Sequence, residues 1–342
     1  MPVYQDGRYP FSGALAMKAS AALETTGGVL PIGRRLTQLV QFHHLAALTV
    51  LVTYALIVLG GTVRATDSGT ACPDWPLCHG QVVPPFETKV MIEWSHRLVA
   101  SLVGFLILGT VVWGWRLYRG NRLYSFGGIL VVVLLAGQVG LGGVTVKTET
   151  AASVVAAHLS MALALFSILI VMTLAGLRLH SGQPLPAIGG FASHARALWT
   201  LPIVTLLTTF ALIIVGAYVS QMEAGLVYPD WPLFDGAVVS SGGRLADIHY
   251  AHRLIAAVVG VLVLAYAWQV KEEDVRLLPL VAAGAALILY AVQVIAGAAN
   301  IWFDLATSVR IVHLALASAL WGALVVAIGY RHLNPSTEGI SA

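Results

Sequence analysis

The stretch PDWPLCHGQVV at residues 73–83 occurs a second time as PDWPLFDGAVV at residues 229–239, an offset of 156 residues. The same offset continues into the next segment, where EWSHRLVASLVG at 93–104 matches HYAHRLIAAVVG at 249–260. After one deletion the offset becomes 155, which pairs His158 with His313. A repeat of this length predicts that the chain is built from two structurally equivalent halves.

The composition is that of a membrane protein. Of the 342 residues, 58% are hydrophobic and 10% are charged, whereas a soluble domain is about a quarter charged. A helix needs roughly 20 apolar residues to cross a bilayer, and eight segments qualify: about 41–61, 94–115, 123–146, 152–177, 197–219, 249–270, 277–299 and 308–330. We therefore predict an all-α polytopic membrane protein with eight transmembrane helices in two pseudo-symmetric four-helix bundles. Because each repeat holds an even number of spans, the halves form a parallel repeat about an axis along the membrane normal.

The predicted organisation is that of two halves between two tails. It comprises an N-terminal tail (1–40), a first half (41–180), a linker (181–196), a second half (197–332) and a C-terminal tail (333–342). The opening segment lacks the compact apolar core of a signal peptide and holds acidic residues that a mitochondrial transit peptide avoids. This favours a bacterial plasma membrane over the mitochondrial inner membrane.

The basic residues predict the orientation. They gather in the short loops after the second, fourth and sixth spans and at both chain ends, which the positive-inside rule places in the cytoplasm. The long loops at about 62–92 and 220–247 then face outward. The net charge is +3, but the scattered basic residues form no patch typical of nucleic-acid binding.

Histidines stand at equivalent positions of the two halves, each within about two turns of the outward end of an even-numbered span: His96, His158, His252 and His313. A single histidine in a span is as often a packing residue as a ligand. Four at repeat positions favour ligation, because two histidines on facing helices can supply both axial ligands to a planar iron porphyrin. We expect one such pair in each half, near the outer surface.

Other residues near these histidines suggest supporting roles. Arg97 and Arg253 follow two of the candidate ligands and suit pairing with heme propionates, although anchoring of the helix end explains them equally well. Glu93 lies three residues before His96 on the same helix face, and the second half has His249 there. A carboxylate beside a heme ligand can take a proton or stabilise positive charge; the alternative is a solvated helix end.

Small residues in the first half would let helix backbones approach a large flat cofactor, although ordinary membrane-helix packing explains most of them. They include Gly60, Gly61, Gly104, Gly137, Gly140, Gly142 and Gly143.

Cys72 and Cys78 are the only cysteines, and both lie in the first outward loop. On the oxidising side of a membrane such a pair predicts a disulfide. It would either hold the loop together, which we favour, or relay electrons by thiol exchange. Tyr228 and Phe234 replace the two cysteines in the second half.

Taken together, these motifs resemble the heme A synthase family of respiratory-oxidase assembly, over about residues 41–330. The matching features are the Glu-x-x-His-Arg motif at 93–97, the His-Arg pair at 252–253, the late histidines His158 and His313, and the paired cysteines. The resemblance implies an oxidoreductase that converts the C8 methyl of heme O to a formyl group, giving heme A, with water as the oxygen source.

The resemblance also implies roles for individual residues. His96 and His158 would flank the substrate heme, with Glu93 assisting the reaction, and His252 and His313 would ligate a resident heme b. The implied partners are heme O, a heme O synthase, oxidase assembly factors, an outside electron acceptor and membrane lipid; a further copy of the chain is another candidate.

Two other functions remain open from the residues. A di-heme b-type electron carrier linked to quinol would hold both hemes permanently. A transporter with two parallel repeats would use the histidines as a proton relay, but its site is expected near the membrane midplane rather than at the outer end.

Overall fold

The computed structural model describes residues 41–186, 195–240, 242–274 and 276–334, without the side chains of residues 195–199. The predicted N-terminal tail, part of the linker and nearly all of the C-terminal tail lie outside these residues. The predicted boundaries of the two halves therefore remain predictions.

Eight helices among the described residues are long and apolar enough to cross a membrane, which confirms the prediction. They are α3 (Phe42–Ala65), α4 (Thr88–Leu117), α5 (Arg122–Lys147), α6 (Ala152–His180), α7 (Ala195–Gln221), α8 (Arg244–Glu273), α9 (Leu277–Trp302) and α10 (Thr307–Leu333). A short 3-10 helix, η1 (Ala224–Leu226), precedes α8. Each long helix exceeds 20 residues, so at 1.5 Å per residue it spans the roughly 30 Å of a hydrocarbon core.

Two helices begin earlier than hydropathy predicts. Helix α4 begins at Thr88 and α8 at Arg244, whereas the apolar runs begin at about 94 and 249. The difference arises because a polar segment at the membrane edge can continue a helix without adding to its hydropathy. As a result, Glu93 lies inside α4, in its second turn, rather than at a solvated helix end.

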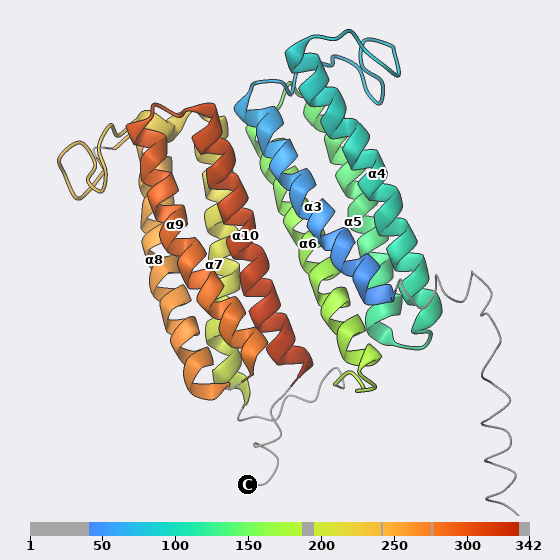
Figure 1. The fold of residues 1–342 in the computed structure, drawn as a ribbon. Coiled ribbons are helices and arrows are strands. Elements are labelled where there is room, and N and C mark those ends of the chain that lie inside the picture. The colour runs from blue at the N-terminus through green and yellow to red at the C-terminus, as the bar shows by residue number, and fades with distance from the viewer. Residues whose placement is uncertain (1–40, 187–194, 241, 275, 335–342) are drawn as a thin grey trace, which may run out of the picture. The chain divides into compact units, whose positions relative to one another are not determined.

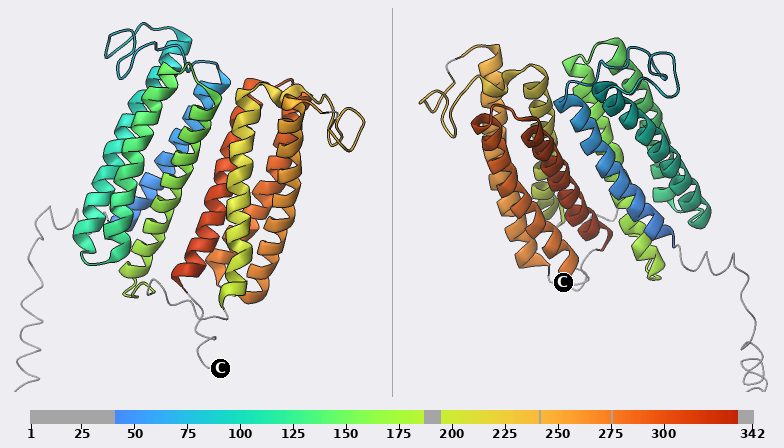
Figure 2. Two further views of the ribbon diagram at one scale, coloured as in Figure 1. Left: turned by 180° about the vertical axis from the view of Figure 1, so that it is seen from behind. Right: turned by 45° about the horizontal axis from the view of Figure 1, so that its top comes forward.

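The helices form two groups of four, α3–α6 and α7–α10, and the two long loops emerge at the same end of the molecule (Figures 1 and 2). Helix α10 contacts α3 and α6 of the first group, and α6 also contacts α7. Across this interface the Tyr54 hydroxyl donates to the Ala315 carbonyl at 3.1 Å, and Trp321 Nε1 donates to Ser167 Oγ at 2.9 Å.

The backbone conformation of the turns is the same in the two halves. Non-glycine residues in the left-handed region occur in pairs that are separated by the repeat offsets of 156 or 155: Asp67 and Glu223, His79 and Asp235, Glu149 and Asp304, Thr150 and Leu305. Since side chains other than glycine rarely adopt this conformation, the paired occurrence shows that the two halves share the same turns.

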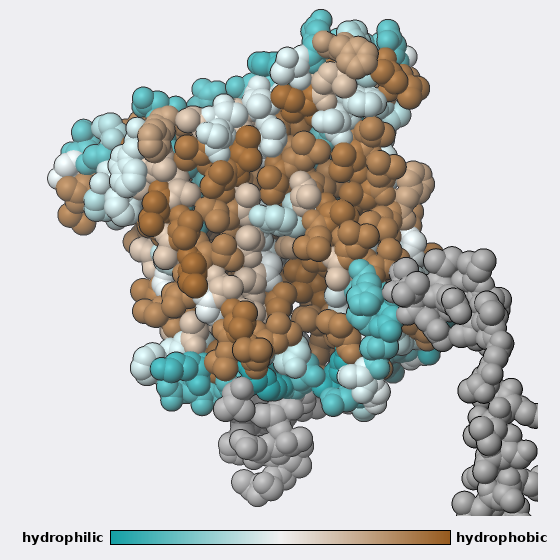
Figure 3. All heavy atoms as spheres, in the orientation of Figure 1, coloured by the Kyte–Doolittle hydropathy of each residue, from teal (hydrophilic) through white to brown (hydrophobic). Residues whose placement is uncertain are grey.

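On the face that Figure 3 shows, a broad apolar band covers the middle of the helices, and hydrophilic residues gather at both ends. Many large apolar side chains of the helices are exposed, among them Phe105 on α4 and Ile129 on α5. An exposed apolar surface of this extent is stable only against lipid. The chain is a multi-pass membrane protein.

Candidate functional site

The four candidate ligands lie where the repeat predicts. His96 is on α4 and His158 on α6, while His252 is on α8 and His313 on α10, each about two turns from the start of its helix. All four are therefore near the end that carries the long loops.

A glutamine accompanies the later histidine of each pair. The amide nitrogen of Gln138 lies 3.2 Å from Nε2 of His158, and that of Gln293 lies 3.3 Å from Nε2 of His313. These contacts hold the orientation of the two rings. The repeat alignment pairs the two glutamines, and an amide repeated within an apolar helix was the signal that could have predicted this role.

A glycine faces each histidine ring. A Cβ atom on Gly60 would lie 3.2 Å from Cε1 of His96, and one on Gly216 would lie 2.9 Å from Cε1 of His252. A Cβ on Gly297 would likewise lie 3.2 Å from Cε1 of His313, whereas one on Gly142 would lie 3.7 Å from Cε1 of His158, an ordinary contact. At Gly60, Gly216 and Gly297 a larger residue would therefore crowd the ring.

The other glycines named from sequence have different surroundings. Gly61 packs closely against Leu314, Gly137 against Met161 and Gly143 against the indole of Trp75, so these glycines allow tight helix packing and do not face a candidate ligand. Among the described residues, Gly104 has only Leu135 near it, and a Cβ on Gly140 would meet no atom within 4 Å.

The histidines have the chemistry that heme iron requires. Within the described chain the Nδ1 atoms of all four are buried without a hydrogen-bond partner. Burying such a nitrogen is costly, and a ring nitrogen that coordinates iron gains a partner. No cluster of three or more acidic, histidine or cysteine side chains suited to a bare metal ion occurs among the described residues, whereas a heme needs only one or two protein ligands. The residues present therefore fit a heme in each half.

Glu93 is buried, with 6% of its surface exposed. Its Oε1 accepts a hydrogen bond of 2.8 Å from Nε of Arg97, one turn further along α4. In the second half, Nε of Arg253 donates to Nε2 of His249 at 3.1 Å. The arginine thus holds whichever residue stands four positions before it, a carboxylate in one half and an imidazole in the other.

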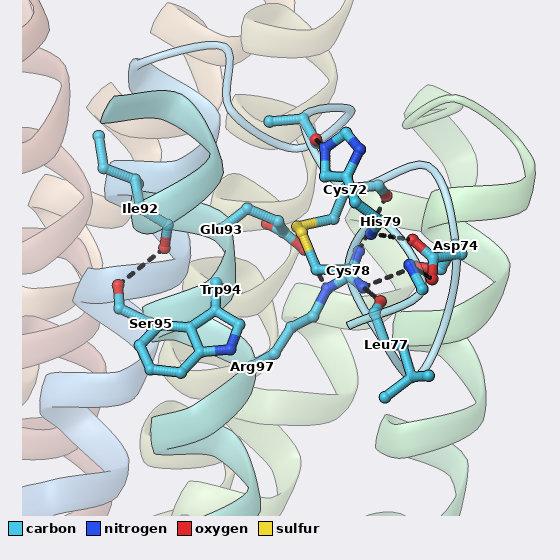
Figure 4. The surroundings of a disulfide bond; sticks show 12 residues. Cys72, Asp74, Leu77, Cys78, His79, Ile92, Glu93, Trp94, Ser95 and Arg97 are labelled. Atoms are coloured by element: carbon cyan, nitrogen blue, oxygen red, sulfur yellow. Dashed lines mark hydrogen bonds and ion pairs between the residues drawn. A yellow bond between two sulfur atoms is a disulfide. The ribbon is translucent and has the colours of Figure 1, made fainter. Parts of the chain in front are cut away.

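The remaining donors of Arg97 point into the first loop. Nη1 donates to the carbonyls of Asp74 and Leu77, and Nη2 donates to that of Cys72 (Figure 4). Arg253 makes the equivalent contacts in the second loop. Pairing of these arginines with heme propionates stays a prediction, while loop anchoring is the role that the contacts of the described residues display.

Cys72 and Cys78 form the predicted disulfide. Both are fully buried, at 0% and 1% exposure, and they pack with Val90 beneath the loop. In the second half the rings of Tyr228 and Phe234 occupy the same two positions, with their centroids 5.1 Å apart.

An aspartate closes the same turn in each loop, a role that sequence reasoning missed. The carboxylate of Asp74 accepts from the backbone N–H groups of His79 and Gly80, and Asp230 does the same for Asp235 and Gly236. These backbone donors, that of the glycine first, hold the pKa of each aspartate below its ordinary range. The repeated PDWPL motif was the available signal.

A comparison with known protein families decides the chain's relationships. The family described as cytochrome oxidase assembly protein matches residues 43–325. The chain belongs to this family.

Individual relatives of this cytochrome oxidase assembly protein family agree. The chain is similar to the heme A synthase of Symbiobacterium thermophilum, with 31% identity over 281 residues that cover 78% of this chain and 88% of the relative. It is also similar to the heme A synthases of Lysinibacillus sphaericus, with 28% identity over 81% and 91% of the two chains, and Geobacillus kaustophilus, with 29% identity over 82% and 88%. These organisms are bacteria, so the family membership favours a bacterial membrane.

Proposed function

We propose that this protein is a heme A synthase, an oxidoreductase that converts the C8 methyl group of heme O to a formyl group and so supplies heme A to respiratory terminal oxidases. Its membership of the cytochrome oxidase assembly protein family supports the proposal. So does the name of its relatives, which match it over most of both chains.

The two halves of the protein bind different hemes. His96 and His158 receive the substrate heme O in the first half. His252 and His313 hold a resident heme b in the second, with Arg253 beside them. A heme b bound there supplies one-electron transfer toward an acceptor outside the membrane.

The buried carboxylate of Glu93 is the observation that carries this assignment, because the otherwise equivalent second half has His249 at that place. An anion held at a fixed position in a low-dielectric site stabilises positive charge that develops on a reacting group. Glu93 therefore lowers the barrier to removing electrons from the methyl carbon, and its carboxylate takes a proton from the attacking water.

The atoms balance over two rounds. Each round takes two electrons and one proton from the carbon, while the attacking water adds its OH group to the carbon and gives up its other proton. The first round yields an alcohol and the second a hydrate, which loses water to leave the formyl group. Electrons leave through the acceptor.

We place the protein in the bacterial plasma membrane with both ends in the cytoplasm and both heme sites near the outer face. Arg116, Arg122, Arg276 and Arg331 support this orientation, because they lie at helix ends opposite the two long loops. A heme O synthase and oxidase assembly factors are the expected partners on the substrate and product sides.

The test is expression of the full chain in cells that make heme O but no heme A, followed by heme extraction and mass analysis. Glu93→Ala and His252→Ala are compared with the wild type, and Glu87→Ala is the matched control, an exposed acidic residue at the start of the same helix. We expect heme A from the wild type and from Glu87→Ala. Its yield should fall by about 100-fold in Glu93→Ala.

The outcomes separate the synthase from the electron carrier. Heme b should remain in Glu93→Ala and be lost from His252→Ala. Two stably bound b hemes with no heme A, unchanged by Glu93→Ala, would instead identify a di-heme electron carrier.

A further inference from the structure

Arg97 connects the first outward loop to Glu93. Its Nη1 atom lies 2.7 Å from the carbonyl oxygen of Asp74 and 2.6 Å from that of Leu77, and Nη2 lies 3.1 Å from the oxygen of Cys72. All three carbonyls belong to the ring of residues 72–78 that the disulfide closes. In Figure 4 the side chain extends from α4 under this loop, with the Glu93 carboxylate beside it.

These contacts leave the guanidinium little freedom. Only 13% of the Arg97 side chain and 8% of the Glu93 side chain are exposed. A planar guanidinium that donates to several fixed carbonyls is held in position and in orientation, which a lysine ammonium cannot reproduce. The carbonyls therefore determine where Nε lies, and Nε determines where the carboxylate of Glu93 lies.

The second half shows that this anchoring does not depend on a disulfide as such. Arg253 donates to the carbonyls of Asp230 and Leu233 at 3.1 and 2.7 Å, and to that of Tyr228 at 3.5 Å. Its guanidinium carbon lies 5.0 Å from the ring centre of Phe234 and 5.7 Å from that of Tyr228. Packed aromatic rings thus hold the carbonyl acceptors in the second loop, as the disulfide does in the first.

We propose that Arg97 is a positioning residue for Glu93, and that the Cys72–Cys78 disulfide acts through it by keeping the three carbonyl acceptors in place. The disulfide is then an anchor of the carboxylate and exchanges no electrons with the substrate. This inference rests on the proposed function in one respect, since Glu93 is the residue to which the reaction is assigned.

The first test measures how strongly Arg97 stabilises the disulfide loop, and it requires no enzyme activity. The full protein in membranes is treated with a water-soluble phosphine, which delivers two electrons to the disulfide while its phosphorus takes the oxygen of a water molecule. Free thiols are counted over time in the wild type, in Arg97→Lys and in the matched variant Arg253→Lys. We expect reduction several-fold faster in Arg97→Lys, because the loop loses its anchor, and the wild-type rate in Arg253→Lys. Equal rates in all three proteins would overturn the proposal.

The second test exchanges one anchor for the other. Cys72→Ser/Cys78→Ser removes the disulfide, whereas Cys72→Tyr/Cys78→Phe introduces the aromatic pair of the second half. The resident heme b content of each variant reports whether the protein has folded. We expect heme A formation to fall by about 10-fold or more in the serine variant and to be largely restored in the aromatic variant.

The same measurement applied to Arg97→Lys should lower kcat with little change in KM, since the substrate still binds but the carboxylate is displaced. An aromatic variant that folds and is as inactive as the serine variant would show that the sulfurs themselves are needed, as in an electron relay, and would refute the proposal. If the wild type makes no heme A, the proposed function fails, and the reduction rates still decide the coupling.

Discussion

Equivalent arginines make the same loop contacts in both halves, but the residue that each arginine holds differs. Arg97 and Arg253 reach equivalent carbonyls in their loops, yet one grips the carboxylate of Glu93 and the other the imidazole of His249. A carboxylate in the first half thus stands where the second half has an imidazole, and the proposed difference in their roles depends on this one side chain. In each of the two loops an aspartate fixes the turn that contains the carbonyl acceptors of the arginine.

Replacing Asp74 by asparagine tests that turn. Asparagine offers one acceptor oxygen where the carboxylate offers two, so one of the backbone N–H groups of His79 and Gly80 loses its partner. We expect faster hydrogen exchange at residues 79–80 and no change at 235–236, measured by mass spectrometry. Asp230→Asn should give the reverse pattern, and equal exchange in both loops for either variant would contradict this role.

The same pair predicts a pH dependence. Because the folded loop lowers the pKa of Asp74, its contribution to loop stability is present above the ordinary aspartate value of about 3.9 and is lost as the pH falls through the lowered pKa. The protection of residues 79–80 should therefore persist at pH 5 and fail only in stronger acid. In Asp74→Asn the titrating carboxyl is absent, so the protection of residues 79–80 should not show this loss in acid.

At the element scale, the site is made by pairs of helices that approach closely at glycine. Gly60 of α3 faces the histidine of α4, and Gly216 of α7 faces that of α8. Gly297 of α9 faces the histidine of α10 in the same way, and Gly142 of α5 faces that of α6 at an ordinary contact distance. Each ring is thus confined between its own helix and the backbone of the helix before it.

Gly216→Ala tests this confinement. The added methyl would lie 2.9 Å from Cε1 of His252, so either the ring or helix α7 must move. We expect the heme b content per chain, measured from the spectrum of the extracted heme, to fall several-fold. Gly284→Ala is the control, because no atom of the part of the chain that the structure describes lies within 4 Å of its Cβ position. This variant should keep its heme, and the substitution should stabilise α9 by up to about 1 kcal/mol.

At the scale of the whole molecule, the two halves are joined through the buried faces of α3, α6, α7 and α10. Trp321 of α10 is central to this interface, with 5% of its surface exposed. Its indole nitrogen donates to Ser167 Oγ at 2.9 Å and to the carbonyl of Leu163 at 3.3 Å. Side chains of each half therefore form hydrogen bonds and packing contacts with the other half.

Trp321→Phe should weaken the whole protein. The substitution removes the indole donor and leaves unfilled space between α10 and α6, at a cost of about 1–4 kcal/mol. We expect a lower midpoint of thermal unfolding in detergent. Trp268→Phe, at a residue that is 63% exposed on α8, should leave the midpoint nearly unchanged, and equal shifts in both variants would argue against the interface.

Much of this arrangement could be predicted from the sequence. The eight spans follow from the length of the apolar runs, because a bilayer accepts only segments of about that length. The two histidine pairs and the Glu93–His249 difference follow from the repeat, because equivalent positions of a duplicated chain occupy equivalent places. The disulfide follows from the location of the two cysteines in an outward loop, where the environment is oxidising. The starts of α4 and α8 were misplaced, because hydropathy does not register a polar helical turn at the membrane edge.

Local composition and spacing along the chain were therefore enough to predict the class of protein, the number of spans and the duplication, and to single out the candidate site residues. The contacts of those side chains came from the tertiary structure alone: Arg97 with the loop carbonyls, Gln138 with His158, and Gly60 with His96. In helices that are apolar on every side, no periodicity marks the face that a neighbour will cover. These contacts join residues 20 or more positions apart, and the packing of one helix against another alone brings them together.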